Sequence, residues 1–99
     1  MRSIEFYVDF ESDVPEFDDE FKTAAKMRLR SLAIPHHEID HAKVAITKSG
    51  ESGKPAQFQA SVIVYARPED MNVTKQDYRM VEALDEALAE IEHQIHAKY

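Results

Sequence analysis

The chain has 99 residues, of which 43% are hydrophobic and 31% are charged, and its formal net charge is −7. This composition is that of one small soluble globular domain and excludes a disordered tail. The acidic balance argues against non-specific nucleic-acid binding, which needs clustered lysine and arginine, and the lack of cysteine excludes disulfides and thiolate metal sites. No segment has the apolar length of a secretory signal or a membrane span, so we expect a cytoplasmic protein without a membrane partner.

The first predicted element is a half-buried strand over residues 4–10, where apolar and polar side chains alternate. Its apolar face carries Ile4, Phe6, Val8 and Phe10. Residues 11–16 then read as a polar connection.

A helix is predicted to begin at residues 18–20 and to end near Ala33. Asp18, Asp19 and Glu20 supply an N-cap and the negative charge that a helix N-terminus favours. Pro35 disfavours helical geometry at the residue before it. The core positions at helical spacing are Phe21, Ala25, Leu29 and Leu32.

Three more strands are predicted before the second helix. Residues 42–47 alternate as one strand, and residues 49–55, which contain both glycines, form a hairpin loop. The next strand presents one apolar face between Phe58 and Ala66 and is broken by residues 67–70. Residues 71–76 form a short last strand.

A closing helix is predicted from Asp77, its N-cap, to near the end of the chain. Its apolar seam comprises Val81, Leu84, Leu88, Ile91 and Ile95, and its opposite side carries Glu82, Asp85, Glu86 and Glu90. The order β-α-β-β-β-α therefore predicts a single α+β domain over residues 1–99, with two helices packed on one face of a four-stranded, mostly antiparallel sheet.

The segment from His37 to His41, HEIDH, has the letters of the zinc-protease motif H-E-x-x-H. That motif must lie on a helix so that its two histidines share one face, and it needs a third ligand. Here it follows Pro35 and enters a strand, and nothing singles out His93 or His96 as the further ligand. We interpret it as a chance match in a solvated connection, with Ile39 as its structural residue. Adventitious binding of a divalent ion by His36, His37 and His41 stays open.

No other pattern indicates catalysis. None of the serines lies in a G-x-S-x-G elbow, and residues 49–54 lack the spacing of a phosphate-binding loop. We therefore predict a protein that is not an enzyme, with no metal, no cofactor and no small-molecule substrate.

Four of the 12 basic residues gather on the first helix. Lys22, Lys26 and Arg30 recur every four residues and form a stripe beside the apolar seam, and Arg28 flanks the seam on its other side. One interpretation is a solvated face that follows the helix dipole. The other is a local cationic surface that holds a phosphate backbone. Further basic residues that could join this surface are Lys43, Lys48, Lys54, Arg67, Lys75 and Arg79.

The length and element order resemble the hibernation-promoting factor and ribosome-associated inhibitor A family, in its short, single-domain form. The resemblance covers nearly the whole chain. It is carried by residues 4–8 (IEFYV), 16–21 (EFDDEF), 26–32 (KMRLRSL), 39–46 (IDHAKVAI) and 81–85 (VEALD), followed by Leu88 and Ile91.

Members of that family bind the decoding channel of the small ribosomal subunit, where they block messenger and transfer RNA and silence idle ribosomes. The resemblance implies a translation inhibitor that acts in ribosome hibernation and the stress response, with small-subunit rRNA as its partner. The rRNA-binding residues that it implies are Lys22, Lys26, Arg28, Arg30, Lys75 and Arg79. The alternative is a regulatory or protein-interaction module of the same fold, which does not bind ribosomes and meets a basic protein partner through its acidic last helix.

Overall fold

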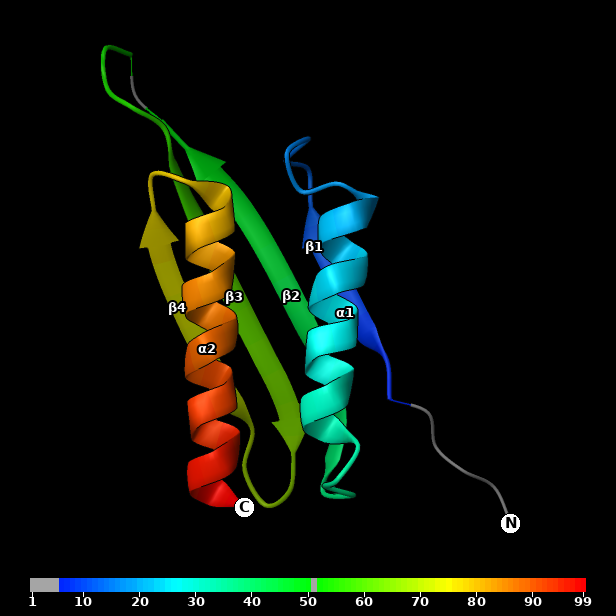
Figure 1. The fold of residues 1–99 in the computed structure, drawn as a ribbon. Helices are drawn as coiled ribbons and strands as arrows, with labels where there is room; N and C mark the ends of the chain where they lie inside the picture. Colours follow the sequence, from blue (N-terminus) through cyan, green and yellow to red (C-terminus); the bar gives the residue numbers. More distant parts are fainter. Residues whose placement is uncertain (1–5, 51) are drawn as a thin grey trace.

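A computed structural model of the protein describes residues 6–50 and 52–99 (Figure 1). The prediction for Ile4 lies outside these residues. The elements are β1 (Val8–Ser12), α1 (Asp19–Ala33), β2 (Ile39–Ser49), β3 (Gln57–Ala66), β4 (Met71–Asp77) and α2 (Met80–Lys98). The α+β class and the predicted order β-α-β-β-β-α are confirmed.

The four strands form one mixed sheet in the order β1-β2-β3-β4. β1 runs parallel to β2, and the other neighbouring pairs are antiparallel. Both helices lie on the same face of the sheet, and they run in the same direction (Figure 1). α2 packs over β3 and β4, whereas α1 lies over the β1 side. Among the described residues, no element covers the opposite face.

The core lies between the sheet and the helices, as the alternation in the strands predicts. Every second residue of β3 from Phe58 to Ala66 is buried, and these side chains face the helices. Val62 in β3 lies opposite Val44 in β2 and Val73 in β4, so one row of β-branched side chains crosses three strands. Apolar burial of this kind is the main favourable term in folding.

α1 begins and ends where its sequence predicts. The Asp18 carboxylate accepts the backbone N–H groups of Glu20 and Phe21 at 3.1 and 3.2 Å, which satisfies two otherwise free donors of the first turn. The helix ends at Ala33, two residues before Pro35. Its buried positions are Ala25, Leu29 and Ala33, with Phe21 and Leu32 partly buried beside them.

The connection between β1 and α1 differs from the prediction. β1 continues through Glu11 and Ser12, which pair with Ala45 and Ile46 of β2. The Ser12 hydroxyl donates to the Ile46 carbonyl at 2.8 Å and accepts the Val14 N–H at 3.1 Å. The connection is also not wholly polar. Val14 and Phe17 are 6% and 2% exposed, and they close one end of the core under α1.

The start of α2 also differs from the prediction. Asp77 is the last residue of β4, where its carboxylate accepts the Arg79 N–H at 3.0 Å, and Arg79 takes the N-cap position without a side-chain hydrogen bond. Because α2 rests on two strands, its buried face is broader than a seam. It includes Met80, Ala83 and Ala87, while Val81 is 44% exposed on the side that faces α1.

β2 begins at Ile39, three residues earlier than expected. Within the described part of the chain, no helix is long and apolar enough to cross a membrane.

Candidate nucleic-acid interface

The predicted basic stripe lies on the flank of α1 that points away from α2. Lys26 and Arg30 are exposed, and Lys22 is half-buried with its ammonium 5.9 Å from the centre of the Phe17 ring. Arg28 pairs with Asp85 of α2 and therefore lies on the side of α1 that faces α2. Since successive residues of a helix are about 100° apart, the stripe lies on the other side of the buried residues of α1. The stripe therefore borders the edge strand β1. Asp19, in the first turn of α1, lies on the same flank of the helix.

Arg28 is separated from this stripe by its contacts. Its guanidinium lies 2.8 Å from the Asp85 carboxylate and 3.9 Å from that of Glu92, both on α2. The Arg28 side chain is 35% exposed and that of Asp85 is 66% exposed. A pair of this exposure contributes about 0.2–1 kcal/mol. Arg28 thus ties the two helices together and has less charge to offer to a ligand.

Lys75 and Arg79 lie at the other side of the molecule. Lys75 is half-buried on the helix-facing side of β4, which is the opposite edge strand, and Arg79 is exposed immediately before α2. Three strand spacings, about 14 Å, separate the two edge strands. The structure therefore does not bring the six candidate residues together: three share the α1 flank, one joins the helices and two lie beyond α2.

Several other basic side chains are paired with carboxylates. Lys43 lies 2.6 Å from Glu11 on the uncovered face of the sheet, and Lys48 lies 2.9 Å from Glu16. These contacts lower the pKa of Glu11 and of Glu16, in each case mainly through the lysine hydrogen bond. Among the residues that the structure describes, Lys26, Arg30, Lys75 and Arg79 take part in no ion pair. Uncompensated positive charge is thus concentrated on the α1 flank and at the start of α2.

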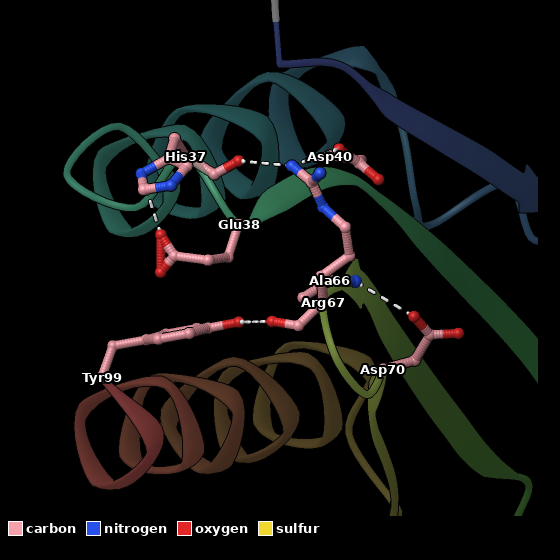
Figure 2. Close-up of polar contacts among 7 residues, drawn as sticks. All are labelled: His37, Glu38, Asp40, Ala66, Arg67, Asp70 and Tyr99. Atoms are coloured by element: carbon pink, nitrogen blue, oxygen red, sulfur yellow. Dashed lines mark hydrogen bonds and ion pairs between the residues drawn. The ribbon is translucent and has the colours of Figure 1, made fainter.

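The HEIDH segment does not form the helix that a zinc-protease site requires. Ile39 begins β2 and is buried, as expected of its structural residue, so His41 stands on a strand. The His37 side chain is 92% exposed and lies 3.0 Å from the Glu38 carboxylate (Figure 2). His36 stacks on Tyr99, at the end of α2, with 4.9 Å between ring centres. Within residues 6–50 and 52–99, no group of three or more His, Cys, Asp or Glu side chains is arranged to hold a metal ion.

His41 has packing partners that the sequence did not reveal. Its ring is stacked between those of Tyr7 and Tyr65 on the uncovered face of the sheet, with ring centres 4.7 and 4.3 Å apart. These three residues, the aromatic ladder, come from β2, from β3 and from the residue that precedes β1. The alternation within each strand places them on that face, but only the register between the strands places them side by side.

One end of the molecule is held together by the turn between β3 and β4 (Figure 2). The Arg67 N–H donates to the Glu38 carbonyl at 3.0 Å, and its guanidinium donates to the His37 carbonyl at 3.2 Å. The Tyr99 hydroxyl donates to the Arg67 carbonyl at 2.9 Å, and the Asp70 carboxylate accepts the N–H of the residue before Arg67 at 3.0 Å. The turn thus connects the loop after α1 to the last residue of the chain.

Replacing Tyr99 by Phe is expected to lower the free energy of unfolding by about 0.5–1.5 kcal/mol, the usual net value of one hydrogen bond. Burial, and secondarily the charge of Glu38, raise the pKa of the Tyr99 phenol. Its contribution is therefore fully present below the usual tyrosine pKa of about 10 and is lost as the pH rises through the higher value of the folded state. Urea unfolding of both proteins at pH 8 and pH 11 measures this difference, which should shrink at the higher pH. A difference that is equal at both values would contradict it.

Two solved structures share this fold over nearly the whole chain. The N-terminal domain of protein Y from Thermus thermophilus matches with a TM-score of 0.70 and 18% sequence identity, covering 99% of this chain and 100% of that one. A ribosomal subunit interface protein from Coxiella burnetii matches with a TM-score of 0.71 and 10% identity, covering 93% and 96% of the two chains. No family model and no curated protein matches the sequence. The chain therefore has the fold of these two proteins.

Proposed function

We propose that this protein is a ribosome-associated inhibitor of translation of the hibernation-promoting factor type. The observation that carries the proposal is the likeness, over almost the full length of both chains, to a protein Y domain and to a ribosomal subunit interface protein. The resemblance that the sequence bears to the same family supports it. In this function the protein acts by occupying a site on the small subunit and catalyses no reaction.

The surface that we propose for rRNA is the flank of α1 that carries Lys22, Lys26 and Arg30. Residues four apart on a helix rise about 6 Å along its axis, so three cations follow one another in a row. Phosphate contacts of this kind give affinity and orientation without reading base sequence. Lys75 and Arg79 form a second, separate contact in the same proposal, and Arg28 supports the helix that carries the stripe.

The net charge of −7 restricts the orientation in which the protein can bind RNA. The outer side of α2 carries exposed carboxylates at Glu82, Asp85 and Glu86, which a phosphate backbone repels. When RNA lies along the α1 flank, the outer side of α2 therefore points away from it. An acidic protein can bind RNA through a part of its surface on which cations predominate.

Co-sedimentation with ribosomes tests the proposal. The purified protein should migrate with small subunits and with whole ribosomes in a sucrose gradient at low salt. With three phosphate contacts, affinity should fall roughly 20- to 40-fold between 50 and 200 mM salt. In the same salt range, its inhibition of cell-free translation should weaken in parallel. A protein that stays at the top of the gradient at every salt concentration would rule out the proposed function.

A further inference from the structure

An apolar groove lies between the first halves of α1 and α2. It encloses about 140 Å³. Ala25, Leu84 and Leu88 are buried side chains that reach its floor, and Phe21 and Val81 form its walls. Val81 leaves 44% of its surface exposed although it belongs to the first turn of a packed helix. The groove thus presents apolar surface that no described side chain covers.

The size of the groove fits one side chain of a partner. A protein cavity of about 150 Å³ with apolar walls takes up benzene, so a space of this size holds one leucine or phenylalanine side chain. Its walls are Phe21, Ala24 and Val81, which offer no hydrogen-bonding groups. The ion pair between Arg28 and Asp85 closes one end, where charged groups meet the apolar floor.

The rim of the groove is acidic. Glu82 is exposed on the outer side of α2, next to the positions of Val81 and Asp85, and Glu20 is exposed in the first turn of α1. With Asp85 these are three carboxylates, and the described cations near them are Arg28, which Asp85 already pairs, and Arg79, one turn before Glu82. Glu20 and Glu82 also complement the helix dipoles. Asp85 stands in the second turn, where the dipole gives no reason for it.

We propose that this groove binds a lysine- or arginine-rich protein segment. One aliphatic or aromatic side chain of the segment enters the space above Leu84, and cations on either side of it contact the carboxylates of Glu20, Glu82 and Asp85. The sign of the rim disfavours RNA, and it disfavours a second copy of this chain, whose own α2 is equally acidic. This site is distinct from the α1 flank proposed for rRNA and does not depend on it.

A pair of synthetic peptides tests the proposal on the whole protein. One is a fluorescein-labelled, lysine-rich peptide with a single central leucine, and the other has serine in place of that leucine. Fluorescence anisotropy at low ionic strength should show binding of the leucine peptide that is at least about tenfold tighter, since burying such a side chain contributes at least that factor. Equal binding of the two peptides, or no binding of the leucine peptide, overturns the proposal.

Protein variants assign the binding to the groove. Val81→Asp should lower the affinity for the leucine peptide at least about tenfold, because it places a charge against the apolar side chain of the peptide. The variant should still fold, because aspartate is well tolerated in a first helical turn. Glu20→Lys with Glu82→Lys should weaken binding of the leucine peptide by a similar factor. The matched control is Glu69→Lys with Glu90→Lys, which makes the same change of net charge away from the groove. An equal loss of peptide affinity in both double variants would overturn the proposal. A dimer of the unmodified protein that Val81→Asp dissociates would overturn it as well.

These results are separable from those on ribosomes. Charge reversal of Lys26 and Arg30 should leave the leucine peptide bound, because both side chains lie on the far flank of α1. Conversely, Val81→Asp should leave co-sedimentation with ribosomes unchanged. Loss of peptide binding in the Lys26 and Arg30 variant would overturn the assignment of the peptide to the groove.

Discussion

Reversing the charge of Lys26 and Arg30 together is expected to release the protein from ribosomes while leaving its fold intact. Both side chains are exposed and form no ion pair among the described residues, so replacing them by glutamate breaks no ion pair that the structure shows. Each lost phosphate contact lowers the salt dependence of binding by a slope of about 1. Affinity should therefore fall more than about tenfold, and the logarithmic salt slope should fall by about 2.

The matched comparison is the double variant Lys75→Glu with Arg79→Glu. It changes the net charge by the same amount at the other side of the sheet, and it also disturbs no ion pair in the described part of the chain. If the α1 flank is the main contact, this variant should keep most of its affinity in the same gradient assay. Equal losses in both variants would show that overall charge decides binding and would remove the α1 flank as a specific site. Circular dichroism should give the same melting temperature, within a few degrees, for both variants and the unmodified protein.

Replacing Ile91 by Ala is expected to have the largest effect on stability. Ile91 is fully buried where α2 crosses the sheet, and truncation of such a side chain leaves a cavity that the surrounding structure fills only in part. The expected loss is about 2–5 kcal/mol, against a total stability of about 5–15 kcal/mol for a domain of this size. Each kcal/mol lowers the melting temperature of a chain of this length by about 4–8 °C.

Thermal and urea unfolding measure this loss directly. Val81→Ala is a suitable comparison, because Val81 lies one turn from buried Leu84 on the same helix and is partly exposed. Its loss should stay below about 1 kcal/mol. If the two substitutions cost the same, α2 would have to be packed in a different rotation about its axis. Such a result would also remove the groove, since Val81 would then face the sheet.

The sequence predicts those parts of the fold that are governed by the chain's own periodicity. α1 is marked at both ends, by the Asp18 cap and by Pro35, and the alternation from Phe58 to Ala66 places β3 without help from other elements. The rotation of α2 about its own axis does not follow from the periodicity of its sequence. Its apolar residues fit a narrow seam and a broad face equally well, and only contact with β3 and β4 selects the broad one. For that reason Val81 was expected in the core.

In the candidate site, too, some features follow from local sequence and others depend on contacts between elements. Helical geometry alone predicts that Lys22, Lys26 and Arg30 form one row and that Arg28 stands across the seam from them. The carboxylates that Arg28 meets lie 57 and 64 positions further along the chain, on a helix whose distance from α1 no local pattern fixes. The groove and the aromatic ladder have the same origin. Both arise between elements, from register and helix spacing.

The aromatic ladder bears on the order in which the sheet comes apart. β1 is joined to β2 along five residues, whereas β2 and β3 pair along nearly the whole length of both strands. Stacking of Tyr7 on His41 adds about 0.5–1.5 kcal/mol to this short junction. Were β1 to detach, β2 would become an edge strand with unpaired backbone groups and alternating apolar side chains, a template for addition of another chain. The ring of Tyr7 thus adds to the contacts that keep β2 an interior strand of the sheet.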